Sequence, residues 1–257
     1  VVVVAILLGK NPMTLFAGLG ATSAVLMLVF KDTITGLAAG VRLTSNDMLH
    51  KGDWITVKSV DANGIVEDMS LTTVKVRNFD NTIVTISPIT LVNGSFQNWI
   101  GMQKSGGRRV KRVVYFDFRS VRLVDETLKR NLLAKHFATE DSFKLKESLQ
   151  KAIDKDIQEG KDIEDLKNPA ALAPTNLQLY RKFMEKYLRQ RPEVNTDLTL
   201  MVRHMEATQC GLPIEFYFFI KDKVWVNYEH ILADIMEHAY ALANEFGLKI
   251  YEQYPEQ

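Results

Sequence analysis

The chain has 257 residues, of which 46% are hydrophobic and 25% are charged, and its formal net charge is +1. This composition excludes a disordered or fibrous chain, and the near-zero net charge gives no general attraction to nucleic acid. A single cysteine, Cys210, excludes an intramolecular disulfide and any multi-cysteine metal site, and it fits a folded part in a reducing compartment.

The first residues form a short apolar run. Residues 1–8 would reach only about 12 Å as a helix, too short for a bilayer, and they lack the basic segment and cleavage site of a signal peptide. We therefore interpret residues 1–12 as the end of a preceding transmembrane helix and the turn that follows it.

The next segment, from Met13 to Phe30, carries no charge and would span about 27 Å as a helix. It predicts a transmembrane helix, with a buried helix of a soluble protein as the alternative. Small residues, which allow close helix packing, gather in its first half. The predicted packing positions are Ala17, Gly18, Gly20 and Ala21.

Lys31 and Asp32 mark the expected membrane boundary, and the residues after them, up to 45, predict an amphipathic interfacial helix. Gly36 and Gly40 stand four residues apart in this helix. That spacing fits either helix packing or a bend used in gating.

Residues 46–105 change to short β-rich runs separated by turn signals, which predict a small β-barrel or sandwich. Asp80 and Asn81 are expected to form a hairpin turn. This domain is too small for the core of an enzyme.

Residues 106–257 show the order strand, helix, insertion, strand, strand, helix, strand, with the insertion at about 137–197. Without the charged helical insertion, this order is that of an α+β ferredoxin-like domain. The basic run at its start fits a solvated linker, a lipid or nucleic-acid contact, or an opening that biases ion entry. The run consists of Arg108, Arg109, Lys111 and Arg112.

No phosphate loop, zinc-protease motif or nucleophile elbow occurs in the sequence, so we expect no catalytic residue, cofactor or metal. The strongest metal candidate is the set His230, Asp234 and His238, spaced four apart on a predicted helix. The apolar stripe of that helix favours a structural role for it.

Three stretches carry a resemblance to a known family: GLGATSAVLMLVFKDTITGLAAGVRL, NDMLHKGDWITV and LTTVKVRNFDNTIVTI. Together they resemble the pore helix and β-domain of the small-conductance mechanosensitive channel (MscS) family. The later pieces GGRRVKR, TLMVRH, GLPIEFY and EFGLKIY are similar to its miniconductance YbdG-type branch.

The resemblance implies a homoheptameric channel with a pore-lining helix, a cytoplasmic β-barrel (Sm/SH3-like) and a ferredoxin-like domain. The implied function is an ion channel, not an enzyme, that is opened by membrane tension and releases ions and small solutes on hypo-osmotic shock. The implied partners are membrane lipids, other copies of the chain, and permeant ions and small solutes, without nucleic acid. The implied location is the bacterial inner membrane, multi-pass, with the C-terminal domains in the cytoplasm.

The resemblance also implies two apolar rings in the pore, at Ala24 and Leu28, with Met27 as the reserve constriction. The founding branch has a glycine at the kink after the pore helix, where this chain has Asp32. The bend is therefore expected at Asp32, Gly36 or Gly40. The rival interpretations are a membrane-anchored or soluble scaffold that binds nucleic acid or protein and, behind it, a metal-dependent enzyme.

Overall fold

The computed structural model describes residues 11–144, 151, 154–155, 158 and 173–253. The predictions for residues 1–10 and for most of the charged part of the insertion lie outside these residues. The chain divides into two compact units, Val1–Gly101 and Met102–Gln257.

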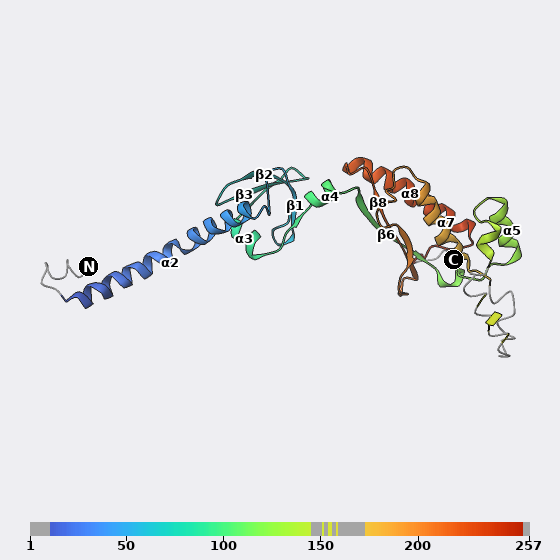
Figure 1. The fold of residues 1–257 in the computed structure, drawn as a ribbon, viewed down its shortest axis with the longest axis horizontal. Helices are drawn as coiled ribbons and strands as arrows, with labels where there is room; N and C mark the ends of the chain where they lie inside the picture. The colour runs from blue at the N-terminus through green and yellow to red at the C-terminus, as the bar shows by residue number, and fades with distance from the viewer. Residues whose placement is uncertain (1–10, 145–150, 152–153, 156–157, 159–172, 254–257) are drawn as a thin grey trace. The chain divides into compact units, whose positions relative to one another are not determined.

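The first unit begins with the long helix α2, Pro12–Ser45, drawn in blue in Figure 1. The Asn11 side chain accepts a hydrogen bond from the Met13 N–H at 2.9 Å, and Pro12 occupies the first turn, where its missing N–H costs nothing. The helix ends where the Asn46 N–H bonds back to the Arg42 carbonyl and Asp47 takes a positive φ of 51°. Both ends are therefore specified locally.

Helix α2 runs without a break through the positions at which a second, interfacial helix was expected to begin. Lys31 and Asp32 lie inside it, and the Thr35 hydroxyl donates to the Lys31 carbonyl at 2.7 Å. The separate interfacial helix is thus a wrong prediction for this structure. Glycine lowers helix stability without ending a helix, and no proline follows Lys31 within α2.

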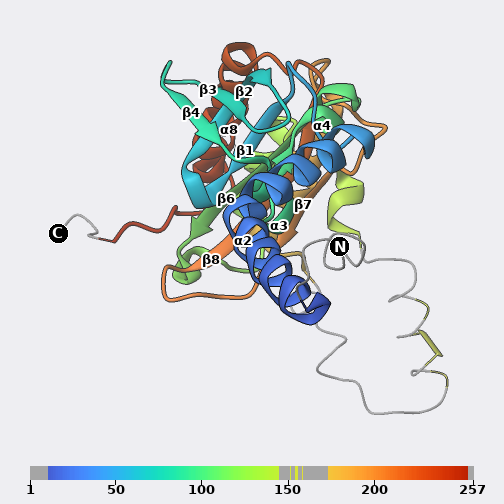
Figure 2. The same cartoon turned by 90° about the vertical axis from the view of Figure 1, so that its left-hand side faces the viewer.

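The rest of the first unit is an antiparallel sheet of five strands in the order β4-β3-β2-β1-β5. Figure 2 shows β2, β3 and β4 side by side. The elements are β1 (Trp54–Val57), β2 (Ala62–Met69), β3 (Val74–Asn78), β4 (Ile83–Ile86), β5 (Gln97–Asn98), the 3-10 helix η1 (Lys58–Val60) and the short helix α3 (Pro88–Asn93). The short helix α4 (Ile100–Lys104) includes the boundary between the two units. The core of the first unit consists of Leu43, Leu49, Ile55, Val57, Ala62, Val66, Val74, Val76, Ile86 and Leu91.

The predicted turn between β3 and β4 is confirmed. Asn81 has a positive φ of 69°, and Asp80 accepts hydrogen bonds from both the hydroxyl and the N–H of Thr82. These bonds favour the ionised carboxylate and lower the pKa of Asp80. The turn fixes the register in which Val76 faces Val84.

The second unit has a three-stranded antiparallel sheet in the order β6-β8-β7. Its strands are β6 (Arg108–Phe116), β7 (Met201–His204) and β8 (Leu212–Ile220), and its helices are α5 (Glu126–Ala134), α7 (Asn176–Gln190), α8 (Trp225–Glu245) and the 3-10 helices η2 (Phe118–Ser120) and η3 (Glu140–Phe143). The expected last strand is reduced to one antiparallel bridge between Phe116 and Ile250.

Helix α7 lies in the region predicted as a solvated insertion, yet it belongs to the core of the second unit. Tyr180, Met184 and Leu188 are fully buried, and the Tyr180 hydroxyl donates to the Ala239 carbonyl at 2.6 Å. Burial raises the pKa of that hydroxyl. An apolar stripe at helical spacing, which includes Leu179 and Leu188, packs this helix into the core although it lies within the expected bounds of the insertion.

Candidate functional site

The apolar surface of α2 is the first component of the candidate site. Phe16–Ser45 is 30 residues long with a mean hydropathy of 1.6, and it is the one helix among the described residues long and apolar enough to cross a membrane. Only 11% of its apolar window is buried. A core helix of a soluble domain would be mostly buried, so this surface requires lipid or other protein to cover it.

The predicted constriction residues lie on this exposed surface. Leu28 and Met27 are 75% and 73% exposed, and Ala24 is exposed as well. Ala24 and Leu28 are four residues apart and share one face of the helix, whereas Met27 lies about 100° away from Leu28 around the axis.

The predicted packing positions extend the same surface toward the start of α2. Ala17 and Ala21 follow the face of Ala24 at helical spacing. Gly18 and Gly20 have no atom within 4 Å of the place where a Cβ would lie. The surface is therefore open to a neighbouring helix.

The three predicted bend residues have different surroundings. Asp32 is exposed, and a Cβ at Gly36 would meet nothing within 4 Å. A Cβ at Gly40 would lie 2.1 Å from the Leu71 carbonyl oxygen in the loop between β2 and β3. The absence of a side chain at Gly40 thus allows the end of α2 to contact the backbone of the β2–β3 loop. A bend at any of the three positions during gating stays a prediction.

The end of α2 is also fixed by apolar packing. Leu43 is fully buried and Ala39 is 4% exposed. Leu43 belongs to the same buried cluster as Leu91 of α3 and Val74 of β3. The last two turns of the helix are therefore part of the core of the β-domain, and a movement of the helix acts on this domain through them.

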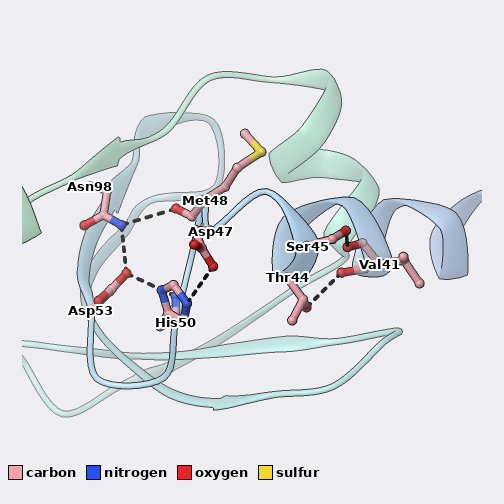
Figure 3. A network of polar contacts seen from close by, with 9 residues as sticks. Val41, Thr44, Ser45, Asp47, Met48, His50, Asp53 and Asn98 are labelled. Atoms are coloured by element: carbon pink, nitrogen blue, oxygen red, sulfur yellow. Dashed lines mark hydrogen bonds and ion pairs between the residues drawn. The ribbon is translucent and has the colours of Figure 1, made fainter.

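A buried carboxylate secures the chain immediately after the helix (Figure 3). Asp53, 6% exposed, accepts the Asn98 amide at 2.8 Å and the His50 N–H at 3.1 Å, and the Asn98 amide also reaches the Met48 carbonyl at 3.3 Å. The helix exit, the start of β1 and β5 are joined in this way. Sequence analysis missed this network because Asp53 and Asn98 are far apart in the chain and neither lies in a recognisable motif.

We expect Asp53→Ala to destabilise the first unit by about 2–3 kcal/mol, because the partly buried amide of Asn98 and the N–H of His50 each lose their carboxylate acceptor. Asp68→Ala is the matched control, since Asp68 is an exposed aspartate in β2. Thermal unfolding followed by the fluorescence of Trp54 and Trp99 measures both. Equal unfolding temperatures for the two variants would show that the network contributes nothing.

The predicted basic run is part of β6, which rules out the solvated-linker interpretation. The Arg108 guanidinium lies 4.4 Å from the centre of the Tyr228 ring, and the Tyr228 hydroxyl donates to the Arg109 carbonyl at 3.0 Å. The ammonium of Lys111 lies 3.7 Å from the buried carboxylate of Glu215. Only Arg109, Lys111 and Arg112 keep largely exposed side chains.

Glu215 receives its main support from β7. Arg203 donates to its carboxylate at 2.6 Å, and this bond, with the charges of Arg203 and Lys111, lowers the pKa of Glu215 against the opposing effect of burial. The basic run therefore compensates one buried acid and presents surplus positive charge on the same strand.

The three residues of the metal candidate on α8 do not form a metal-binding group in the structure. His230, Asp234 and His238 are all exposed, His238 bonds through Nδ1 to the Asp234 carbonyl at 2.8 Å, and its ring stacks on Tyr187. Among the described residues there is no group of three His, Cys, Asp or Glu side chains placed to hold a metal ion.

Comparison with known proteins identifies the β-domain. Residues 32–101 match the family model described as "Mechanosensitive ion channel, beta-domain". The chain is 33% identical over 90 residues to the small-conductance mechanosensitive channel MscMJ of Methanocaldococcus jannaschii, covering 35% of this chain and 25% of that protein. It is 30% identical over 135 residues to the large-conductance channel MscMJLR of the same organism, covering 52% of this chain and 37% of that protein.

A solved structure extends the likeness to the whole chain at the level of the fold. The closed-state crystal structure of Helicobacter pylori MscS aligns with a TM-score of 0.59 at 14% identity, covering 97% of this chain and 74% of that chain. The chain therefore has an MscS-like fold, with one long apolar helix among its described residues and a β-rich domain. The resemblance is confirmed for the β-domain, where residues 32–101 match the mechanosensitive-channel family model, and the two curated relatives are themselves described as mechanosensitive channels.

Proposed function

We propose that this chain supplies the pore-lining helix and the intracellular part of a mechanosensitive ion channel. One observation carries the proposal: an exposed apolar helix of membrane-spanning length is built directly into a β-domain of the mechanosensitive-channel type. The chain matches only part of its curated relatives, 25% of one and 37% of another, so the activity of the whole protein is part of the proposal.

The proposed mechanism follows from the surface of α2. Copies of the helix surround one axis, with the face of Ala24 and Leu28 toward the pore. Gly18 and Gly20 lie about 80° to either side of Leu28 around the helix and allow close contact with the neighbouring helices. A ring of leucines excludes water and ions without filling the pore. Membrane tension favours a state of larger in-plane area, in which the helices separate and the apolar ring becomes wet.

The finer assignments rest on the sequence resemblance. We place the protein in the miniconductance YbdG-type branch, as a homoheptamer in the bacterial inner membrane with several membrane passes. In this assignment its β-barrel is Sm/SH3-like, its second unit is ferredoxin-like, and both lie in the cytoplasm. Opening then releases ions and small solutes after hypo-osmotic shock, and the surplus charge of Arg109, Lys111 and Arg112 acts on passing ions or on lipid.

The decisive experiment is patch-clamp recording of the protein in membranes that lack other mechanosensitive channels. Suction is expected to open discrete currents that are absent from patches without the protein. If purified protein inserts into membranes but gives no tension-dependent current, the channel proposal fails and a membrane-anchored scaffold becomes the better account.

A further inference from the structure

A cavity of about 140 Å³ lies in the second unit, where the segment after α5 meets α7. Part of its lining is aromatic: the rings of Phe137 and Phe183 contact each other edge to face, with their centres 5.2 Å apart, and both rings pack against Phe246. A volume near 150 Å³ is known to accept a ligand the size of benzene, so this cavity has room for one small group.

The polar groups around the cavity can donate hydrogen bonds or carry positive charge. Lys182 and Lys186 of α7 line it together with His136, and no aspartate or glutamate does. The backbone N–H groups nearby are already used: those of His136 and Phe137 bond to carbonyls of α5, and that of Thr139 bonds to the Ser142 hydroxyl. The side chains alone therefore define the ligand chemistry, and they favour an anion.

The two lysines differ from their neighbours in having no acidic partner. Lys129 pairs with Glu140, Lys135 with Glu245 and Lys144 with Asp141, so every other lysine of this region that the structure describes is compensated. Lys182 and Lys186 have no ion pair among the described residues. Like charges four apart on a helix repel each other, so this arrangement costs stability unless an anion binds between them.

A hydroxyl pair completes the set of donors. The hydroxyls of Thr139 and Ser142 lie 3.2 Å apart, and only one of their two protons is needed for the bond between them. The other proton remains for a ligand. Two ammonium groups, an imidazole and a hydroxyl around a small cavity suit a tetrahedral oxyanion, which accepts several bonds at once.

We propose that this cavity binds the phosphoryl group of a small soluble solute. The charges come from Lys182 and Lys186, further hydrogen bonds come from His136 and the Thr139–Ser142 pair, and the rings of Phe137 and Phe183 line part of the cavity. A ligand held there would join α7 to the segment that follows α5. All of its residues belong to the second unit, so the proposal does not rest on the proposed channel function.

The test is scanning calorimetry of the purified protein, with phosphate exchanged for chloride at constant ionic strength. At a tenfold excess over its dissociation constant, phosphate is expected to raise the unfolding temperature of the second unit by about 3–5 °C. Lys182→Gln and Lys186→Gln should each weaken binding roughly three- to tenfold. Without phosphate, the same variants should be at least as stable as the native protein, because each substitution removes the repulsion between the two lysines. If the lysines had a purely structural role, the variants would instead be less stable.

Arg189→Gln is the matched control, since it removes the same charge from α7 at a position outside the cavity. It should keep the full response to phosphate. Equal loss in all three variants would show diffuse attraction, and a full response in the double lysine variant would also overturn the site. Adenosine monophosphate at the same concentration separates the two sources of the phosphoryl group: a larger shift indicates a phosphorylated metabolite, and an equal shift indicates free phosphate.

Discussion

Leu28→Ser is expected to open at clearly lower suction than the native protein. Leu28 is 75% exposed on α2 and shares the face of Ala24, the position of the other proposed apolar ring. Each leucine side chain in contact with water costs roughly 1.5–3 kcal/mol, so its replacement by serine removes a barrier of that size per subunit against wetting of the pore. Patch-clamp recording at stepped suction measures the shift.

Leu26→Ser is the matched control for this prediction. Leu26 is also an exposed leucine, 53% exposed, and it lies about 160° away from Leu28 around the helix. A polar residue there faces away from the proposed pore and is expected to leave the opening threshold unchanged or to raise it. If both variants lower the threshold equally, the effect reflects general loosening of the helix, and Leu28 loses its assignment as a constriction.

Gly40→Ala is expected to destabilise the first unit by about 2–3 kcal/mol or more, which would show as loss of assembled protein and a lower unfolding temperature. The added Cβ would lie 2.1 Å from the Leu71 carbonyl oxygen, so either the end of α2 or the β2–β3 loop must move. Neither moves easily, because Leu43 and Val74 on the two elements are fully buried in one cluster. Trp54 and Trp99, stacked at 4.7 Å in this unit, report its unfolding by fluorescence.

Gly36→Ala is the control, one helical turn earlier in α2. Its Cβ would meet nothing within 4 Å, and alanine is a better helix former than glycine by about 1 kcal/mol, so stability should be unchanged or raised. A change in opening threshold without loss of stability would assign the gating bend to Gly36. Equal destabilisation by both substitutions would mean that the contact between Gly40 and Leu71 does not cause the loss of stability in the Gly40→Ala variant.

The sequence determined the features that depend on local pattern. The uncharged run from Met13 to Phe30 indicated a membrane-length helix, the short β-rich runs of residues 46–105 indicated a small β-domain, and Asp80 with Asn81 indicated a hairpin turn within it. Each of these signals lies within a few residues and reflects the period of a helix or a strand. The motifs of the helix and β-domain also carried the family resemblance.

Only the tertiary structure decided the features that join distant segments. Three contacts link residues that are far apart in the sequence and share no helical or strand periodicity. They are the close approach of Gly40 to Leu71, the hydrogen bond from Asn98 to Asp53, and the ion pairs of buried Glu215 with Lys111 and Arg203. The place of helix α7 in the core was decided in the same way, because the partners of Tyr180 are the ring of Phe116 in β6 and the Ala239 carbonyl of α8, both far away in the chain. Packing partners and compensating charges are set when the chain folds, and a pattern of single residues does not contain them.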